Sequence, residues 1–138
     1  MSTNTEPIRR SSGVVILSLL LFFFTVPHNV EDFAFGEPAR FGLSALAVTL
    51  GLSAVFAAQG LALTWTGGGT RRGYILHAVL GFSWAVAALA AHSGEVLLPG
   101  AYRSGLGSVV FLLGIVILGG ALGLASIRAL RTAPQTVG

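Results

Sequence analysis

A histidine and two acidic residues follow one another closely where the first apolar segment of the chain ends. His28, Glu31 and Asp32 lie in the stretch "FFFTVPHNVEDFAFGEPARFG", in which a hydrophobic run reaches Pro27 and then turns polar. Imidazole and carboxylate groups bind Zn, Fe and Mn, and without a metal they accept and donate protons. This stretch therefore predicts a metal-binding or acid–base site.

A second His-x-x-Glu pair, His92 and Glu95, precedes another Pro/Gly turn in "HSGEVLLPGAYRSG". Residues three apart on a helix share a face, with Cβ atoms about 5–6 Å apart. If both pairs end neighbouring helices on one side of a membrane, their side chains meet. We predict as catalytic His28, Glu31, Asp32 and His92, and as ligands of a divalent Zn, Fe or Mn ion His28, Glu31, His92 and Glu95.

A second interpretation of these residues involves no chemistry. Histidines and acids at a membrane boundary also cap helices and face lipid headgroups. Glu31 and Asp32 could pair with Arg40 or Arg103 and close the outer loops, at little net gain in stability. The two interpretations differ in whether the side chains share a pocket.

The composition identifies the environment of this chain. Its 138 residues are 54% hydrophobic and only 9% charged, with a mean hydropathy of +0.83, whereas soluble domains carry roughly 25% charged residues. The absence of cysteine excludes disulfides, thiolate metal sites, iron–sulfur clusters and c-type haem attachment. No basic run is interleaved with aromatic residues, so we expect no nucleic-acid partner. The lipid bilayer is the expected surroundings.

Four apolar segments separated by Gly/Pro-containing connectors predict an all-α fold, a four-transmembrane-helix bundle in one integral membrane domain covering residues 1–138. The first segment is uninterrupted only from Gly13 to Val26, so it reaches the ~20 residues of a span only if its helix continues past Pro27. No small-x-small cleavage site follows it, which favours an uncleaved helix over a signal peptide. The expected spans are 12–35, 41–65, 73–92 and 106–128, with tails 1–11 and 129–138.

The arginines predict the orientation of the bundle, because positive residues favour the cytoplasmic side of a membrane. In a four-span layout one side receives six of them, and only Arg40 and Arg103 fall on the other. Four of the five acidic residues fall with this pair. The prediction is a multi-pass protein of the cell membrane with both termini cytoplasmic and the His/carboxylate cluster outside. The six arginines on the predicted cytoplasmic side are Arg9, Arg10, Arg71, Arg72, Arg128 and Arg131.

The two His-x-x-Glu pairs also suggest an internal repeat. In both halves of the chain, His, Glu, a Gly/Pro turn and Arg follow in the same order before a long apolar segment. This order is compatible with a parallel duplication of a two-helix hairpin. Chance similarity between two apolar sequences is the alternative.

The segment 28–32, "HNVED", resembles the signature of the HXXEE-domain membrane proteins, small four-helix proteins named for that motif, although Asp32 stands where the family has glutamate. His92 and the turn "PGAYR" resemble the histidine and the Tyr/Pro-Gly turn of the same family. The resemblance covers most of the chain and implies the four-helix membrane fold, but no particular reaction. A looser similarity, of architecture only, is to emopamil-binding-type four-helix proteins, which work on sterols with buried acids.

Three functions are compatible with these features. The first is an enzyme or binding protein for a lipid-like small molecule, using the His/carboxylate cluster. The second is a haem- or quinone-binding subunit of a redox complex. His77 and His92 are separated by about 22 Å of helix, so they cannot bind one haem together, and Gln59 would be a poor partner for His77.

The third function is that of a non-catalytic accessory subunit. Gly119 and Gly123 form a small-x-x-x-small face on the last apolar segment. Such faces allow close approach of two helices in a membrane. This face predicts either packing within the chain or a homodimer.

Overall fold

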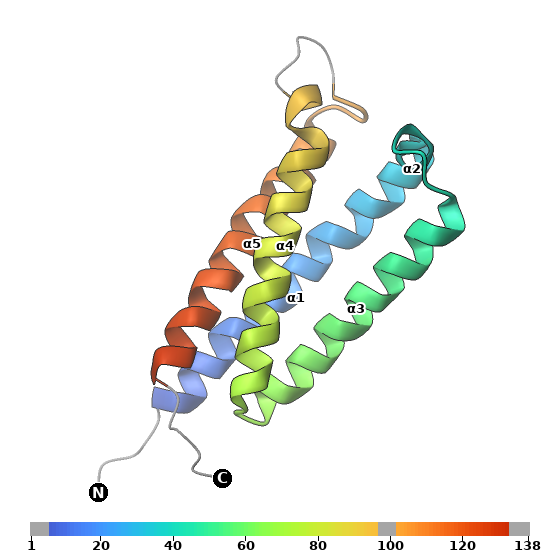
Figure 1. The fold of residues 1–138 in the computed structure, drawn as a ribbon. Helices are drawn as coiled ribbons and strands as arrows, with labels where there is room; N and C mark the ends of the chain where they lie inside the picture. The colour runs from blue at the N-terminus through green and yellow to red at the C-terminus, as the bar shows by residue number, and fades with distance from the viewer. Residues whose placement is uncertain (1–5, 97–101, 133–138) are drawn as a thin grey trace, which may run out of the picture.

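The structure is a computed structural model that describes residues 6–96 and 102–132, without the side chains of residues 6–10, 93, 95 and 96. In these residues the chain forms five helices and no strand: α1 (Glu6–Ala34), α2 (Glu37–Arg40), α3 (Ala45–Gly67), α4 (Arg71–Val96) and α5 (Leu106–Thr132). The four long helices run alternately up and down side by side, and α2 caps one end (Figure 1). The predicted all-α four-helix bundle is confirmed.

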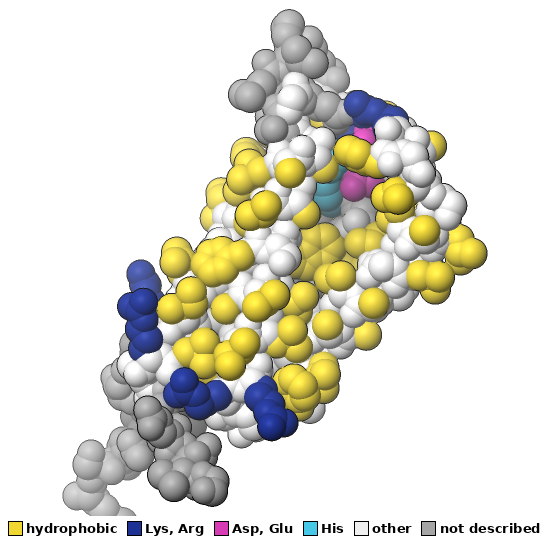
Figure 2. All heavy atoms as spheres, in the orientation of Figure 1, with side chains coloured by type: hydrophobic (Ala, Val, Ile, Leu, Met, Phe, Trp, Pro, Cys, Tyr) yellow, Lys and Arg dark blue, Asp and Glu magenta, His cyan; other side chains and the backbone are white. Residues whose placement is uncertain are grey.

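The four long helices are also apolar enough to cross a membrane. The segments concerned are Ser11–Ala34, Ala45–Gly67, Arg71–His92 and Leu106–Thr132. Large apolar side chains such as Phe23, Leu46 and Ile117 are exposed on the outside of the bundle, and apolar side chains cover most of the face in Figure 2. This surface suits lipid chains better than water. It indicates a multi-pass membrane protein.

The first helix continues through Pro27, as its length requires. Proline removes one backbone donor from a helix, but membrane helices tolerate this when nearby groups bond the backbone. The carbonyl that loses its helical donor to Pro27 is that of Phe23. On either side of it, Thr25 Oγ1 donates to the Phe22 carbonyl at 3.3 Å and Asn29 Nδ2 donates to the Thr25 carbonyl at 2.7 Å. The continuation carries the next helical turn, with His28, to the end of the bundle.

The second span begins later than the predicted residue 41. Gly42 has a positive φ of 67°, which a helix cannot contain, and Ser44 then caps α3 by accepting a hydrogen bond from the Ala47 N–H at 3.1 Å. Residues 41–44 therefore form a link. The connector "GEPAR" between the first two spans contains the one-turn helix α2.

Glycines set the close packing of α4 against α5. A Cβ atom added to Gly119 would lie 2.6 Å from the Gly81 carbonyl oxygen, and one added to Gly123 would lie 2.7 Å from the Phe82 ring. The face predicted for packing or for a homodimer is thus covered by α4 of the same chain. Of its two predicted uses, packing within the chain is the one observed.

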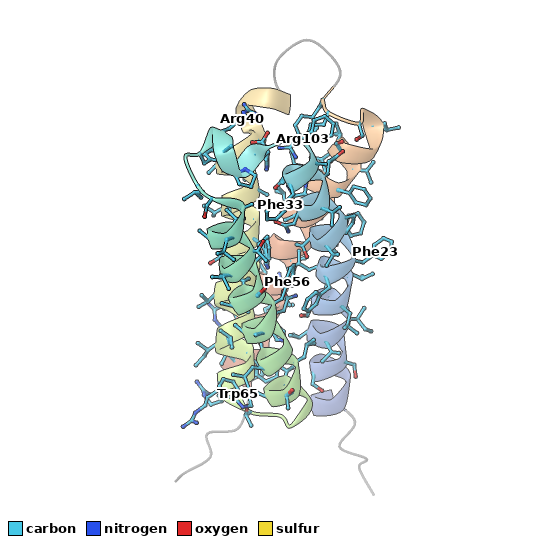
Figure 3. All side chains as sticks on the ribbon, turned by 90° about the vertical axis from the view of Figure 1, so that its right-hand side faces the viewer. Phe23, Phe33, Arg40, Phe56, Trp65 and Arg103 are labelled. Carbon is cyan, nitrogen blue, oxygen red and sulfur yellow. The ribbon has the colours of Figure 1, made fainter. Side chains whose placement is uncertain are left out.

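The third long helix is the most exposed of the four. It meets α1 through stacked rings of Phe22 and Phe56, with centroids 5.2 Å apart, and through Gln59, whose Nε2 donates to Ser18 at 3.1 Å. Phe56 projects into the space between α1 and α3, whereas Phe23 points outward (Figure 3).

The two ends of the bundle differ in charge. α1 begins and α5 ends at one end (Figure 1), where the side chains of Arg71, Arg72, Arg128 and Arg131 are exposed. α1 and α4, which carry the two His-x-x-Glu segments, both run toward the other end. This arrangement is compatible with the duplication, which stays a prediction.

Candidate functional site

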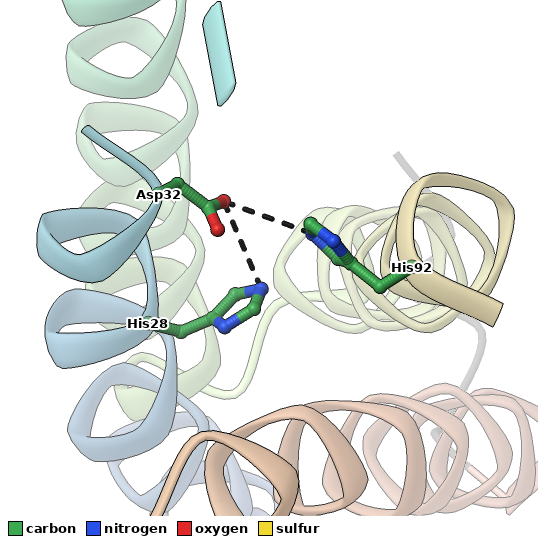
Figure 4. A group of neighbouring side chains, drawn as sticks. All are labelled: His28, Asp32 and His92. Atoms are coloured by element: carbon green, nitrogen blue, oxygen red, sulfur yellow. Dashed lines mark ion pairs between the residues drawn. The ribbon is translucent and has the colours of Figure 1, made fainter. Parts of the chain in front are cut away.

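Three of the predicted residues meet at the end of the bundle that lies opposite these arginines. Asp32 Oδ2 lies 3.8 Å from His28 Nε2 and 3.8 Å from His92 Nε2. The imidazole rings stand nearly perpendicular, with centroids 4.9 Å apart. Both histidines are only 3% exposed. Figure 4 shows the carboxylate of α1 directed at both rings, one from its own helix and one from α4.

The helical repeat decides which of the two neighbouring acids joins the histidines. Asp32 lies four residues after His28, on the face of α1 directed at α4. Glu31 is directed at α5, where its Oε1 accepts a hydrogen bond from Ser108 Oγ at 2.5 Å. The structure therefore groups His28, Asp32 and His92 and places Glu31 apart from them. The side chain of Glu95 lies outside the described residues.

Arg103, in the turn before α5, holds the carboxylates in place. Its Nη1 donates to Asp32 Oδ1, and its Nη2 donates to Glu37 Oε1 at 3.0 Å. The guanidinium also lies over the Tyr102 ring, 5.0 Å from its centroid. Burial opposes the charge, but the hydrogen bond and the charge of Asp32 outweigh it and raise the pKa of Arg103. Of the ion pairs that the interpretation without chemistry allowed, that of Asp32 with Arg103 is observed.

The same guanidinium influences the proton on His92. Arg103 Nη2 lies 3.1 Å from His92 Nδ1. An arginine can only donate, so in this contact Nδ1 is the acceptor and the neutral ring carries its proton on Nε2. That N–H is directed toward Asp32 at a distance too long for a hydrogen bond. Asp32 Oδ2 is therefore available to another group.

Glu37 belongs to the site, although it was not predicted there. It begins α2, is 4% exposed, and contacts both Arg103 and the exposed Arg40. The positive φ of Gly36, 74°, turns the chain back over the end of α1 so that this carboxylate faces inward. The sequence does contain a signal, since Gly-Glu-Pro is a typical start of a short helix after a turn.

A cavity of about 340 Å³ adjoins the three residues. Its polar wall consists of His28, Asp32, Glu37 and His92, with Asn29 beside them, and the remainder is mainly apolar side chains of α1, α3 and α4. In Figure 2 imidazole and carboxylate atoms are visible at the bottom of a recess surrounded by apolar side chains. Phe33 and Arg103 both project into the space between the helices at this end (Figure 3).

His77 lies in the other half of α4, nearer the arginine-rich end. It is fully buried, and neither ring nitrogen has a hydrogen-bond partner among the described residues. It lines none of the cavity just described. Trp84, also on α4, contacts Phe56, with ring centroids 5.7 Å apart, and forms part of the cavity wall.

The arrangement allows two kinds of chemistry. Two imidazoles on one carboxylate can transfer protons to and from a bound molecule, and the same atoms can bind a metal ion. The apolar lining beside them suits a hydrocarbon group. No protein-family model matches the chain, and comparisons with curated proteins and with solved structures found no match.

Proposed function

We propose that this chain is a membrane enzyme that takes an amphiphilic molecule from the bilayer and acts on its polar group at His28, Asp32 and His92. The observation that carries the proposal is the shared cavity: the buried histidines and Asp32 form one wall, and apolar side chains form the others. A water-soluble substrate needs no such lining, and a purely structural ion-pair cluster needs no adjoining space. The proposed resemblance to HXXEE-domain proteins fits this placement of the site.

The cavity has a route of entry from the lipid phase. Phe41 and Leu43 line it and are themselves 57% and 50% exposed on the outside of the bundle. Ala87 of α4 also lines it and is exposed. A hydrocarbon chain can therefore enter sideways between α3 and α4 or over the link before α3, and its polar end reaches the histidines first.

Proton transfer is the chemistry that the side chains can supply. Asp32 Oδ2 lies 3.8 Å from each ring, which leaves room for a hydroxyl, amine or water between them. One imidazole accepts a proton from this group while the other, with its proton on Nε2, donates one. The carboxylate stabilises whichever ring is charged, and Arg103 orients it by donating a hydrogen bond to Oδ1.

A substitution that fills the mouth of the cavity tests whether the cavity binds an amphiphile. In Ala87→Phe a ring enters the cavity, whereas Ala90→Phe adds the same ring to an exposed position outside the lining. We expect wild type and Ala90→Phe, purified in mild detergent, to retain a single-chain amphiphile by native mass spectrometry. Ala87→Phe should retain at least about tenfold less, since its ring occupies the apolar part of the cavity. Equal retention by the two variants would count against the proposal.

The proposal places the site on the outer side of the membrane, because the exposed arginines lie at the opposite end. The chain has no cysteine, so labelling of a single introduced cysteine reports the orientation of the chain without a signal from native cysteines. Ser104→Cys, in the turn beside the site, should react with a membrane-impermeant maleimide on intact cells. Thr70→Cys, in the turn between α3 and α4, should react only after the membrane is opened. The reverse pattern would place the site in the cytoplasm.

A further inference from the structure

We infer that His28 Nε2, Asp32 Oδ2 and His92 Nε2 form a binding site for one divalent transition metal ion of the zinc class. The inference rests on the proposed function and adds the cofactor of the same site. Compared with the predicted ligand set, Asp32 takes the place of Glu31, and the side chain of Glu95 lies outside the described residues. All three residues line the cavity.

The distances suit a metal after a small contraction. The three ligand atoms lie within 4.8 Å of one another, and both contacts of Asp32 Oδ2 measure 3.8 Å. Metal–ligand bonds of about 2.0–2.2 Å in a tetrahedral site place neighbouring ligand atoms about 3.4 Å apart. Each contact of Asp32 Oδ2 must therefore shorten by about 0.4 Å, and the distance between the two imidazole nitrogens, which is at most 4.8 Å, by up to about 1.4 Å. Rotations of the three side chains can bring the ligand atoms together.

The type and number of ligands resemble an open site. Two histidines and one carboxylate leave a fourth position for water or substrate, as in catalytic zinc sites. The three residues line the cavity, so that position can face it, and no fourth His, Cys, Asp or Glu of the described residues joins the group. Arg103 bonds the other oxygen of Asp32 and so orients Oδ2 toward the rings.

Two carboxylates, Asp32 and Glu37, line the cavity beside the histidines. Among the described residues, Arg103 bonds both of them, and Arg40 also bonds Glu37. The two guanidinium groups balance the two carboxylates, so a bound dication would be held mainly by direct ligation from Asp32 Oδ2 and the two ring nitrogens.

Metal binding changes the contact between Arg103 and His92. Ligation through Nε2 moves the ring proton to Nδ1, which then faces a donor instead of accepting from it. Nη2 must then leave His92, and it can do so without losing all partners because Glu37 Oε1 already accepts from it at 3.0 Å. The metal-bound site keeps its carboxylate contacts.

The test compares two neighbouring carboxylates. Asp32→Asn removes a proposed ligand, whereas Glu31→Gln removes the same charge from the adjacent residue that bonds Ser108. Protein stripped with chelator is titrated with Zn²⁺, and with Co²⁺ as a spectroscopic probe of coordination. We expect one ion per chain in wild type and Glu31→Gln. Binding by Asp32→Asn should be more than about 100-fold weaker, since even outer-shell changes weaken metal affinity 10–100-fold.

His28→Gln and His92→Gln extend the test if Asp32→Asn does not fold. Each should lose the Co²⁺ absorption bands of nitrogen-ligated metal while the monomer elutes as wild type does. Stoichiometric binding that survives in a folded variant of any of the three residues would overturn the inference, as would the absence of binding in wild type. Retention of the amphiphile by stripped wild type is measured separately, so failure of the metal site leaves the proposed function standing.

Discussion

Replacing Arg103 with methionine should lower the free energy of unfolding by about 3–5 kcal/mol, the usual cost of leaving a buried charge without its partner. The Arg103 side chain is 5% exposed, and so is that of Glu37, one of its two carboxylate partners. Asp32, the other partner, has a 19% exposed side chain. Methionine preserves the length and the apolar stem of the side chain, so the loss reports mainly on charge and hydrogen bonds. Equilibrium unfolding in mixed micelles measures it.

Arg40→Met is the matched control for this experiment. Arg40 also bonds Glu37, but its side chain is 58% exposed, and exposed ion pairs contribute only about 0–1 kcal/mol. The loss in Arg103→Met should therefore be several times larger. Equal small losses in both variants would show that the Arg103 cluster contributes no more than a surface pair.

Gly119→Ala should separate α4 from α5 and destabilise the bundle by about 1–3 kcal/mol or more, the range for an overpacked interior. The added methyl group would lie 2.6 Å from the Gly81 carbonyl oxygen and 3.2 Å from the Ala85 nitrogen. Both atoms belong to the backbone, so no side-chain rotation relieves the contact and the helices must move apart. Thermal unfolding in detergent, followed by circular dichroism, measures the change.

The next residue in the chain provides the control. A Cβ added to Gly120 has no neighbour within 4 Å, and alanine favours a helix more than glycine by about 1 kcal/mol. Gly120→Ala should therefore be neutral or slightly stabilising. A Gly119→Ala protein as stable as Gly120→Ala would contradict the close packing of these two helices.

The sequence predicted the bundle because its main determinants are local. Long apolar segments specify spans, and the necessary length of the first one predicted that its helix passes Pro27. The predicted start of the second span, residue 41, precedes the observed start of α3 at Ala45, because hydropathy does not report the positive φ of Gly42. Backbone conformation at a single glycine is a local detail that apolar composition conceals.

The candidate site was predicted only in part, and for a geometric reason. The motif suggested that His28 would pair with Glu31, three residues on, but Asp32, four residues on, faces α4. Both spacings put two side chains on adjoining parts of one helix surface. Which of the two acids faces the histidines depends on where the neighbouring helices pack. The inward orientation of Glu37 depends on the same packing, and the residue pattern of a single sequence does not reveal it.

The loose attachment of α3 has a consequence for how large a ligand the protein admits. α3 contacts α1, α2 and α4 but not α5 in the described residues, and it is the most exposed span. The glycine-packed pair α4–α5 does not depend on α3, so of the four spans α3 can move with the least loss of buried surface. A ligand wider than the cavity would therefore be accommodated by a displacement of α3 into the surrounding lipid, rather than by separation of α4 from α5.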